Sequence, residues 1–162
     1  MTNLEGSHRA AFLSFLLEAK RETYAAQGDE ATVAPLLPGS KQLEYRAGDY
    51  VYRDVYFGMA YFVGQEVVAD RERAVWSMSY AGGMIASARE RSDARAIYAF
   101  LRRALRHGSA REPYRGPARF SEDPFVYTSA TNGELDSFWG LEQITQGGEA
   151  VYELRYAGGF LG

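Results

Sequence analysis

The strongest constraint on how this chain can fold is a segment that it contains twice. Residues 62–84 read FVGQEVVADRERAVWSMSYAGGM and align without a gap with residues 138–160, which read FWGLEQITQGGEAVYELRYAGGF. Nine of these 23 positions are identical, and the match continues upstream of them. A recurring segment of this length marks a structural unit that is used twice. We therefore expect one domain over residues 1–162, with repeat one at about 8–84 and repeat two at about 92–160.

Each repeat begins with the residue pattern of an amphipathic helix. In repeat one, the pattern predicts a helix from Ser7, a favourable N-cap, to a stop at Gly28. In repeat two, it predicts a helix that starts near Ser92 or Asp93 and ends at Gly108. Apolar residues recur in both segments at helical spacing, so we expect each helix to pack one face against the rest of the domain.

Between the helices, runs of alternating apolar and polar residues predict β-strands. They lie at residues 50–57, 61–68 and 75–80, and again at 125–129, 138–145 and 150–156, with shorter candidates near 43–45 and 118–120. The dipeptide Gly147-Gly148 is typical of a tight hairpin turn. The order of elements predicts an α+β fold of two α-β-β-β(β) units related by a pseudo-twofold axis. In this fold an antiparallel sheet carries two packing helices, one from each unit.

Composition excludes several classes of protein. The chain has 18 Lys and Arg against 21 Asp and Glu, a net charge of -3, which disfavours nucleic acid as a partner. It has no cysteine, so thiol catalysis, disulfides and zinc-thiolate sites are excluded. The N-terminal segment has the pattern of neither a signal peptide nor a membrane span. We expect a soluble cytoplasmic protein with no membrane partner.

Repeat one also carries a long motif. It runs through Gly48-Asp49-Tyr50-x-Tyr52-x-Asp54-x-Tyr56-x-Gly58, Phe62-x-Gly64-Gln65-Glu66-x-Val68 and Trp76-x-Met78-x-Tyr80, followed later by Pro113-Tyr114-Arg115-Gly116-Pro117 and Tyr156-Ala157-Gly158-Gly159. With these motifs the chain resembles the bacterial domain-of-unknown-function family 5680 over nearly its whole length. The resemblance implies no established activity. It also implies that some relatives resemble effector domains attached behind a helix-turn-helix DNA-binding domain.

Two glutamates occupy equivalent positions of the two repeats. Strand alternation places Glu66 and Glu142 among apolar neighbours, with Gly64 and Gly140 two residues before them. Burial raises the pKa of a carboxyl group unless a cation or hydrogen-bond donors compensate, which is how many binding and acid–base carboxylates are made. The alternative is a structural role, in which both carboxylates accept hydrogen bonds inside the sheet.

Aromatic side chains and one further acid gather around Glu66. The residues expected on the faces of the two adjacent strands are Tyr50, Tyr52, Asp54, Tyr56, Trp76 and Tyr80. Together with Glu66 and Glu142 they form the set of candidate ligand-binding residues. Repeat two has Ser129 where repeat one has Asp54, so we expect a single site in repeat one or between the repeats. The alternative is a tyrosine-rich core whose hydroxyl groups reach water.

Other chemistries have weaker signals. No spacing typical of metal ligands is present, and the glycine pairs belong to no phosphate-binding motif, so we predict neither a metal nor a cofactor. Nine arginines fall within residues 89–119. We interpret this run as the solvated face of a helix and the loop after it. The alternative is a surface for an anionic partner.

We interpret the chain as a small-molecule-binding or sensor-like domain. Its ligand would be cationic or aromatic and held by the aromatic residues, with Glu66 or Glu142 as charge partner. One alternative is a small hydrolase or isomerase that uses paired carboxylates. Another is an interaction module that forms a homodimer through an exposed sheet edge or aromatic face. The positions of Asp54, Glu66 and Glu142 relative to a pocket distinguish the first two.

Overall fold

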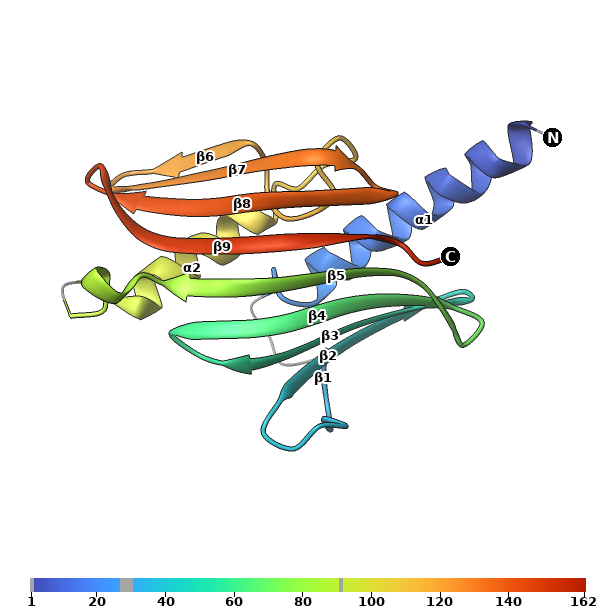
Figure 1. Ribbon diagram of the computed structural model, residues 1–162, viewed down its shortest axis with the longest axis horizontal. Helices are drawn as coiled ribbons and strands as arrows, with labels where there is room; N and C mark the ends of the chain where they lie inside the picture. Colours follow the sequence, from blue (N-terminus) through green and yellow to red (C-terminus); the bar gives the residue numbers. More distant parts are fainter. Residues whose placement is uncertain (1, 27–30, 91) are drawn as a thin grey trace.

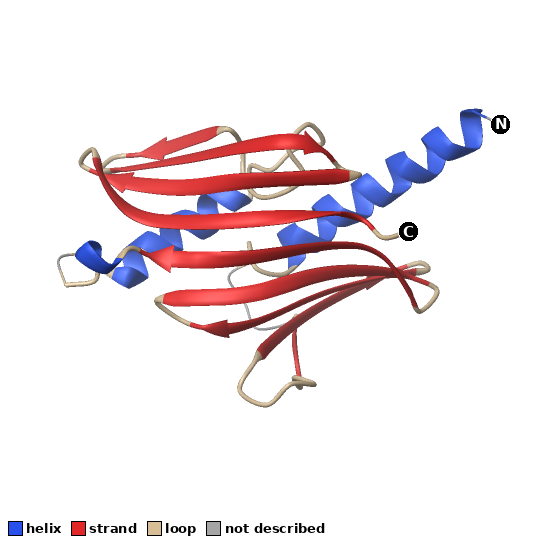
Figure 2. Cartoon of the chain, in the orientation of Figure 1, coloured by secondary structure: helices blue, strands red, loops and turns tan. Residues whose placement is uncertain are grey.

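The computed structural model describes residues 2–26, 31–90 and 92–162. Within these residues the main element is one antiparallel sheet of nine strands, and two helices lie across the same face of it (Figures 1 and 2). The strands are ordered β1-β2-β3-β4-β5-β9-β8-β7-β6. The strands that follow each helix therefore form one half of the sheet, and β5 meets β9 in the middle. The predicted α+β class and antiparallel sheet are confirmed.

The bounds of the elements follow the chain from one half of the sheet to the other. The first half comprises α1 (Thr2–Glu22), β1 (Thr32–Val33), β2 (Lys41–Ala47), β3 (Tyr50–Gly58), β4 (Tyr61–Asp70) and β5 (Arg73–Met84). A short 3-10 helix (Ala86–Ala88) joins it to the second half. That half comprises α2 (Ala94–Leu105), β6 (Arg119–Glu122), β7 (Phe125–Glu134), β8 (Ser137–Gln146) and β9 (Glu149–Phe160).

Helix α1 begins before the predicted N-cap at Ser7, which lies inside it. Residues 2–6 contain no proline, so each of them has the backbone N–H that a helix uses. Helix α1 ends at Glu22, and turns follow it over residues 23–26, so it stops short of the predicted end at Gly28, which lies outside the described residues. The buried face of α1 consists of Phe12, Phe15, Leu16 and Ala19, which belong to the core between helix and sheet.

Helix α2 lies where the sequence predicts it. The Asp93 side chain accepts a hydrogen bond from the backbone N–H of Arg95 and so caps the helix at its N-terminus. The apolar stripe buries Ile97, Phe100 and Leu101 against the second half of the sheet. The opposite face of the helix carries arginines, and two of these, Arg95 and Arg102, line a pocket.

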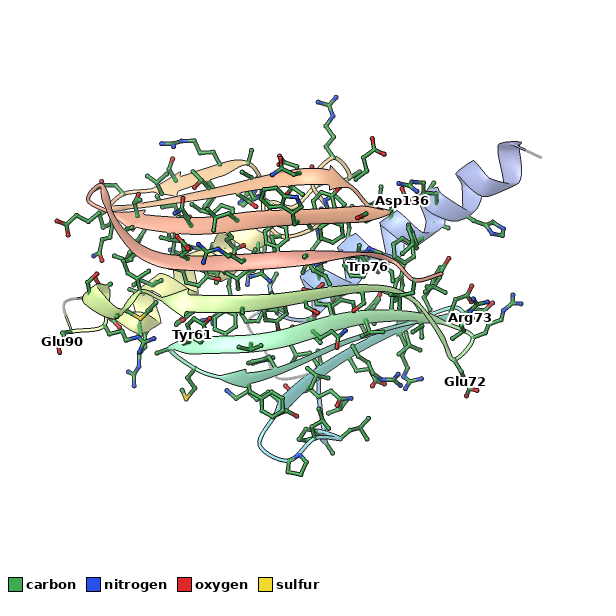
Figure 3. The ribbon with its side chains drawn as sticks, viewed as in Figure 1. Tyr61, Glu72, Arg73, Trp76, Glu90 and Asp136 are labelled. Carbon is green, nitrogen blue, oxygen red and sulfur yellow. The ribbon has the colours of Figure 1, made fainter. Side chains whose placement is uncertain are left out.

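The strands extend beyond their predicted bounds, because pairing continues past the alternating runs. The two central strands have 12 residues each. Between β8 and β9 the predicted turn is confirmed: Gly147 and Gly148 have φ angles of 58° and 84°, which glycine adopts without strain. The β4–β5 turn at Glu72 lies at the opposite end of the sheet from Tyr61 and Glu90 (Figure 3).

Two glycines allow tyrosine rings to cross a neighbouring strand. Gly64 on β4 pairs with Tyr80 on β5, and a side chain at Gly64 would lie 2.3 Å from the Tyr80 hydroxyl. The same arrangement occurs at Gly140 on β8, over which the ring of Tyr156 from β9 lies. Because the glycine leaves this space, each ring passes over one strand and brings its hydroxyl to the next. This crossing positions the candidate site described below.

The face of the sheet away from the helices carries large apolar side chains that remain exposed. Phe57, Val63 and Trp139 are 43%, 48% and 62% exposed, respectively. They border a depression of about 800 Å³ whose floor includes Ser79, Ala81 and Ala157 of the central strands. Among the described residues, neither helix is long and apolar enough to cross a membrane.

Candidate functional site

Three carboxyl groups lie buried on the helix-covered face of the sheet. Asp54 on β3 stands directly opposite Glu66 on β4 in the strand register, and Glu142 occupies β8 in the other half. Their exposed fractions are 3%, 3% and 0%. Buried acids are costly unless cations or donors compensate them, so the partners of each acid define what the site can do.

Glu142 is held by a complete set of donors. The guanidinium of Arg115 donates two hydrogen bonds to it, of 3.1 and 2.9 Å, and the hydroxyls of Tyr127 and Tyr152 donate two more, of 2.6 and 2.7 Å. Burial raises the pKa of both tyrosines, and the charge of Glu142 raises it further. They therefore stay protonated and donate, so Glu142 serves as a structural hydrogen-bond acceptor.

Glu66 is paired with a lysine from the first helix. The Lys20 ammonium donates to its carboxylate at 2.5 Å and to the backbone carbonyl of Tyr114 at 2.6 Å. Arg115 lies 3.9 Å from the second oxygen of Glu66. Burial lowers the pKa of Lys20, although the charge of Glu66 opposes this effect. The ammonium also lies 5.7 Å from the centre of the Trp76 ring.

Asp54 lacks a direct cationic partner in the described part of the chain. Its carboxyl accepts a hydrogen bond of 2.6 Å from Tyr80, whose ring crosses β4 at Gly64. Burial, and after it the charge of Glu66, raises the pKa of Asp54 to about 7, against the opposing effects of Tyr80, Arg115 and Lys20. Asp54 therefore exchanges its proton near neutral pH and can serve as a donor or an acceptor.

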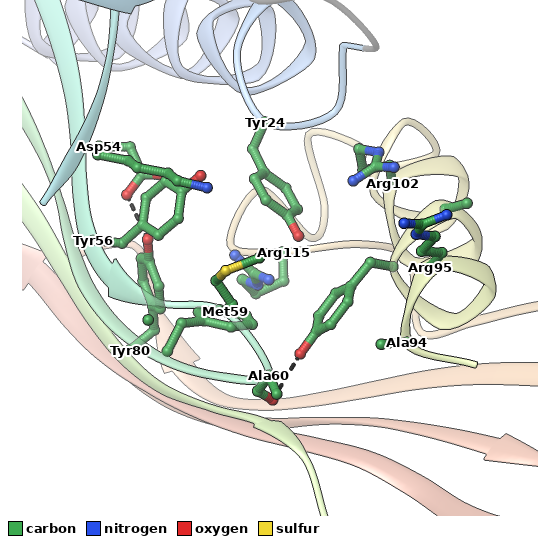
Figure 4. A pocket seen from close by; sticks show the side chains of 15 residues that line it. Tyr24, Asp54, Tyr56, Met59, Ala60, Tyr80, Ala94, Arg95, Arg102 and Arg115 are labelled. Atoms are coloured by element: carbon green, nitrogen blue, oxygen red, sulfur yellow. Dashed lines mark hydrogen bonds between the residues drawn. The ribbon is translucent and has the colours of Figure 1, made fainter. Parts of the chain in front are cut away.

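A pocket of about 640 Å³ opens beside Asp54, between α2 and strands β3 to β5 (Figure 4). Its apolar wall includes Met59, Phe62 and Ala99. Its polar groups are Tyr24, Lys41, Asp54, Tyr56, Tyr80, Arg95, Tyr98, Arg102 and Arg115. Ala60 also lines the pocket, and its carbonyl accepts a hydrogen bond from the Tyr98 hydroxyl (Figure 4). The combination of an apolar wall with several polar groups is typical of a site for a small organic molecule.

The structure brings part of the predicted set of ligand-binding residues to this pocket. Asp54, Tyr56 and Tyr80 line it. Glu66 and Tyr52 line a much smaller cavity of about 20 Å³ behind it, which shares Tyr24 and Arg115 with the larger pocket.

The other predicted residues lie away from the pocket. Tyr50 packs against the rings of Phe12 and Phe15 on α1, at the far end of the first half. Trp76 is fully buried and stacks on Phe138, and Glu142 contacts Arg115. Among residues 2–26, 31–90 and 92–162, no group of three or more potential metal-binding side chains is found.

Sequence reasoning missed the two cations of the site. Lys20 follows Phe12 and Leu16 at intervals of four residues, so it belongs to the buried stripe of α1, and this spacing was an available signal. Arg115 was counted in the arginine run that we interpreted as solvated, yet it is only 8% exposed. Of that run, Arg91 lies outside the described residues.

The family model described as "Domain of unknown function (DUF5680)" matches residues 54–161. The chain belongs to this family. The part that matches DUF5680 contains Asp54, Glu66, Arg115 and Glu142, whereas Lys20 precedes it. No curated protein and no solved structure matches the chain.

Replacing Arg115 tests whether the buried ion pair stabilises this DUF5680 fold. Arg115→Met leaves Glu142 and Glu66 buried without that cation, so we expect the free energy of unfolding to fall by about 3 to 5 kcal/mol. The matched control is Arg9→Met, because Arg9 also donates two hydrogen bonds to one carboxylate, Asp136, but both partners are exposed. We expect that loss to stay below about 1 kcal/mol. Urea denaturation measures both free energies of unfolding. Equal losses in the two variants would show that the buried pair of Arg115 and Glu142 stabilises the fold no more than an exposed one.

Asp54 should make the stability of the protein fall as pH rises. Its pKa is about 7 in the folded state, against an ordinary value of 3.8, so the folded state binds the proton more tightly. Stability should decline between about pH 4 and 7 and level off above. Asp54→Asn removes this slope. Between pH 4 and pH 7 its free energy of unfolding should therefore rise relative to that of the wild type by up to about 4 kcal/mol.

The same pH series includes Asp136→Asn as its control. Asp136 is exposed, and its pKa is lowered by its hydrogen bonds with Arg9, so this substitution should produce no gain with rising pH. Denaturation midpoints at intervals of one pH unit provide the measurement. Parallel stability curves for the wild type and Asp54→Asn would show that Asp54 does not retain its proton.

Proposed function

We propose that the domain binds a small organic molecule in the pocket between α2 and the sheet, as a binding or sensor-like module. The observation that carries this proposal is the pocket itself, with its volume of about 640 Å³, its apolar wall and its polar groups. Ligand sites in proteins commonly have this size and this mixture of surfaces. Asp54, Tyr56 and Tyr80, which line it, are members of the predicted set.

The connection between pocket and ion pairs supports a sensor-like role. Arg115 lines the pocket, pairs with Glu142 and lies 5.5 Å from the centre of the Tyr80 ring. Lys20 connects Glu66 to the carbonyl of the residue before Arg115, Tyr114. A ligand that contacts Arg115 or Asp54 would therefore bias the contacts that join α1 and the segment 113–117 to the sheet. Such differential contact is what a ligand-dependent change requires.

Binding has more support than catalysis by paired carboxylates. Asp54 and Glu66 stand opposite each other on adjacent strands, as the two acids of a hydrolase or isomerase with paired carboxylates would have to. Asp54 lines the large pocket, whereas Glu66 faces a cavity of about 20 Å³ and bonds to Lys20. A reaction would have to reach both acids, whereas a ligand needs only Asp54 and the walls.

We further propose that the two halves arose by duplication and are related by a pseudo-twofold axis. A bulge follows Val68 in the β4–β5 pair and follows Ile144, its aligned residue, in the β8–β9 pair. Tyr80 and Tyr156, also aligned, face each other where β5 meets β9. The halves differ at the hydroxyl of that tyrosine, which contacts Asp54 in one and Ser129 in the other.

A ligand screen with a blocked pocket tests the proposed function. A panel of neutral, cationic and anionic aromatic compounds should include ligands that raise the melting temperature. A ligand at 100 times its Kd adds about 2.7 kcal/mol of stability. Ala99→Phe fills the pocket and should abolish the shift, whereas Ala96→Phe, on the same helix but outside the pocket lining, should retain it. No shift with any compound, or equal shifts in both variants, would count against binding.

A second candidate function is self-association through the uncovered face of the sheet. Val63 and Trp139 stand at aligned positions of the two halves and are both exposed there. A patch that presents aligned positions on either side of one central groove is suited to a second copy of the chain, because a twofold interface uses the same surface twice. Exposed apolar surface of this kind marks interaction sites.

Light scattering coupled to gel filtration tests this second candidate. We expect a dimer whose dissociation constant rises at least about 100-fold on Trp139→Glu, since a buried charge in an apolar interface costs several kcal/mol. Ser137→Glu, on the same strand but outside the groove lining, is the control. A wild-type chain that elutes as a monomer at high micromolar concentration would rule the dimer out.

A further inference from the structure

The pocket between α2 and the sheet has more positive than negative groups. Lys41, Arg95, Arg102 and Arg115 line it, and among the lining residues that the structure describes, Asp54 is the one acidic side chain. Two of the four cations already have partners. Arg115 is paired with Glu142, and the Lys41 ammonium lies 5.9 Å from the centre of the Tyr56 ring.

The remaining two cations belong to α2. Arg95 and Arg102 are seven residues apart, so they stand on one side of the helix two turns from each other. Figure 4 shows both guanidinium groups beside the pocket. Neither guanidinium has an ion pair or hydrogen bond with the described residues. By contrast, Arg103, the next residue after Arg102, is paired with Glu122 at 2.8 Å and does not line the pocket.

The Tyr24 hydroxyl completes this polar end of the pocket. Figure 4 shows it pointing into the space between Arg115 and α2. Burial raises the pKa of Tyr24, and the charges of Arg115 and Arg102 partly oppose this, which places the hydroxyl within the field of both cations. It has no hydrogen-bond partner in the described part of the chain. The neutral Tyr24 hydroxyl and the guanidinium groups of Arg95 and Arg102 can all donate hydrogen bonds.

The other walls of the pocket are apolar or aromatic. Phe62 and Tyr56 come from the sheet, Ala99 and Tyr98 from α2, and Met59 lies at the exposed β3–β4 turn. The site therefore offers a flat apolar region next to a group of donors. A ligand that fits both regions has an aromatic or aliphatic body and one anionic head.

We propose that this pocket selects a small organic carboxylate, with its head at Arg102, Arg95 and the Tyr24 hydroxyl and its body against Phe62 and Met59; this inference rests on the proposed function. Guanidinium groups bind carboxylates through paired, charge-assisted hydrogen bonds. The carboxylates that the sequence suggested as partners of a cationic ligand, Glu66 and Glu142, are already bonded to Lys20 and Arg115. Among the described lining residues, Asp54 is the acid that could pair with a cationic ligand.

Asp54 gives the carboxylate ligand a defined pH dependence. The groups that act on Asp54 are Glu66 on β4, Tyr80 on β5, Lys20 on α1 and Arg115 from the segment after α2. Below about pH 7 Asp54 is protonated, and the pocket then contains no negative charge from its lining residues. An anion should therefore bind more tightly at pH 6 than at pH 8, and a cation should do the reverse.

Three ligands with the same body and different heads test the proposal. They are 2-naphthoate, 2-naphthylmethanol and 2-naphthylmethylammonium, each titrated by calorimetry into the full chain at pH 6 and pH 8. We expect 2-naphthoate to bind at least about 10-fold more tightly than the alcohol, and the ammonium compound to bind least. Asp54→Asn should remove the pH dependence of 2-naphthoate binding.

Variants on α2 locate the anionic head. Arg102→Gln and Arg95→Gln should each weaken 2-naphthoate binding about 10-fold and leave 2-naphthylmethanol unchanged, because the alcohol makes no ion pair. Arg103→Gln changes the net charge equally on the same helix, but its side chain is paired with Glu122, so it should have little effect.

The outcomes separate the two proposals. If the alcohol or the ammonium compound binds as tightly as 2-naphthoate and Ala99→Phe abolishes that binding, the pocket is a ligand site and the preference for a carboxylate is wrong. The carboxylate proposal would also be overturned if Arg103→Gln and Arg102→Gln weakened 2-naphthoate binding equally. The affinity would then depend on the net charge of the protein and not on a contact with Arg102. If none of the three ligands binds at millimolar concentration, the carboxylate inference fails. If the wider panel gives no thermal shift either, the proposed function fails with it.

Discussion

The bidentate ion pair between Arg115 and Glu142 is the contact on which the rest of the site depends. It joins the segment after α2 to the centre of β8, with side chains only 6% and 0% exposed. Removing such charges from water is costly, and here the cost is offset because Tyr127 and Tyr152 supply the remaining donors to Glu142. The same guanidinium also borders Glu66 and the pocket, so one arginine links both halves of the sheet.

The backbone arrangement could be predicted from the sequence further than the site could. Strand alternation grouped Asp54 with Tyr52 on one face of its own strand, because that pattern is local, whereas the pairing of β3 with β4 is what sets Asp54 opposite Glu66. It could not identify the cations, since Lys20 lies 46 residues from Glu66 and Arg115 lies 27 residues from Glu142. A pattern of burial says that an acid needs a partner without saying which distant residue supplies it. The arginine run was interpreted as solvated for the same reason: composition reports charge, and only packing reports that Arg115 is enclosed.

The two tyrosine crossings show how a small local change makes the halves of the sheet different. In both halves a glycine lets a tyrosine ring cross one strand, and the hydroxyl then meets a side chain of the next strand. For Tyr80 that partner is Asp54, whereas Tyr156 shares hydrogen bonds with Ser129 and Thr131. The crossing is thus the same in both halves, but one half presents an acid where the other presents neutral hydroxyls. A titratable acid beside the crossing tyrosine is therefore found in the half that contains the pocket.

The charge balance of the buried cluster explains why Asp54 is the acid that holds a proton. Lys20 and Arg115 supply two positive charges to three carboxyl groups, so full ionisation would leave one buried charge uncompensated. Glu66 and Glu142 contact the cations directly, whereas the hydrogen bond of the Asp54 carboxyl within the described residues comes from the Tyr80 hydroxyl, and burial raises the pKa of Asp54. With Asp54 protonated, the described lining residues of the pocket carry no negative charge. The sign of the electrostatic potential in the pocket is then set by Lys41 and by the arginines of α2, which have no counter-charge among the described lining residues.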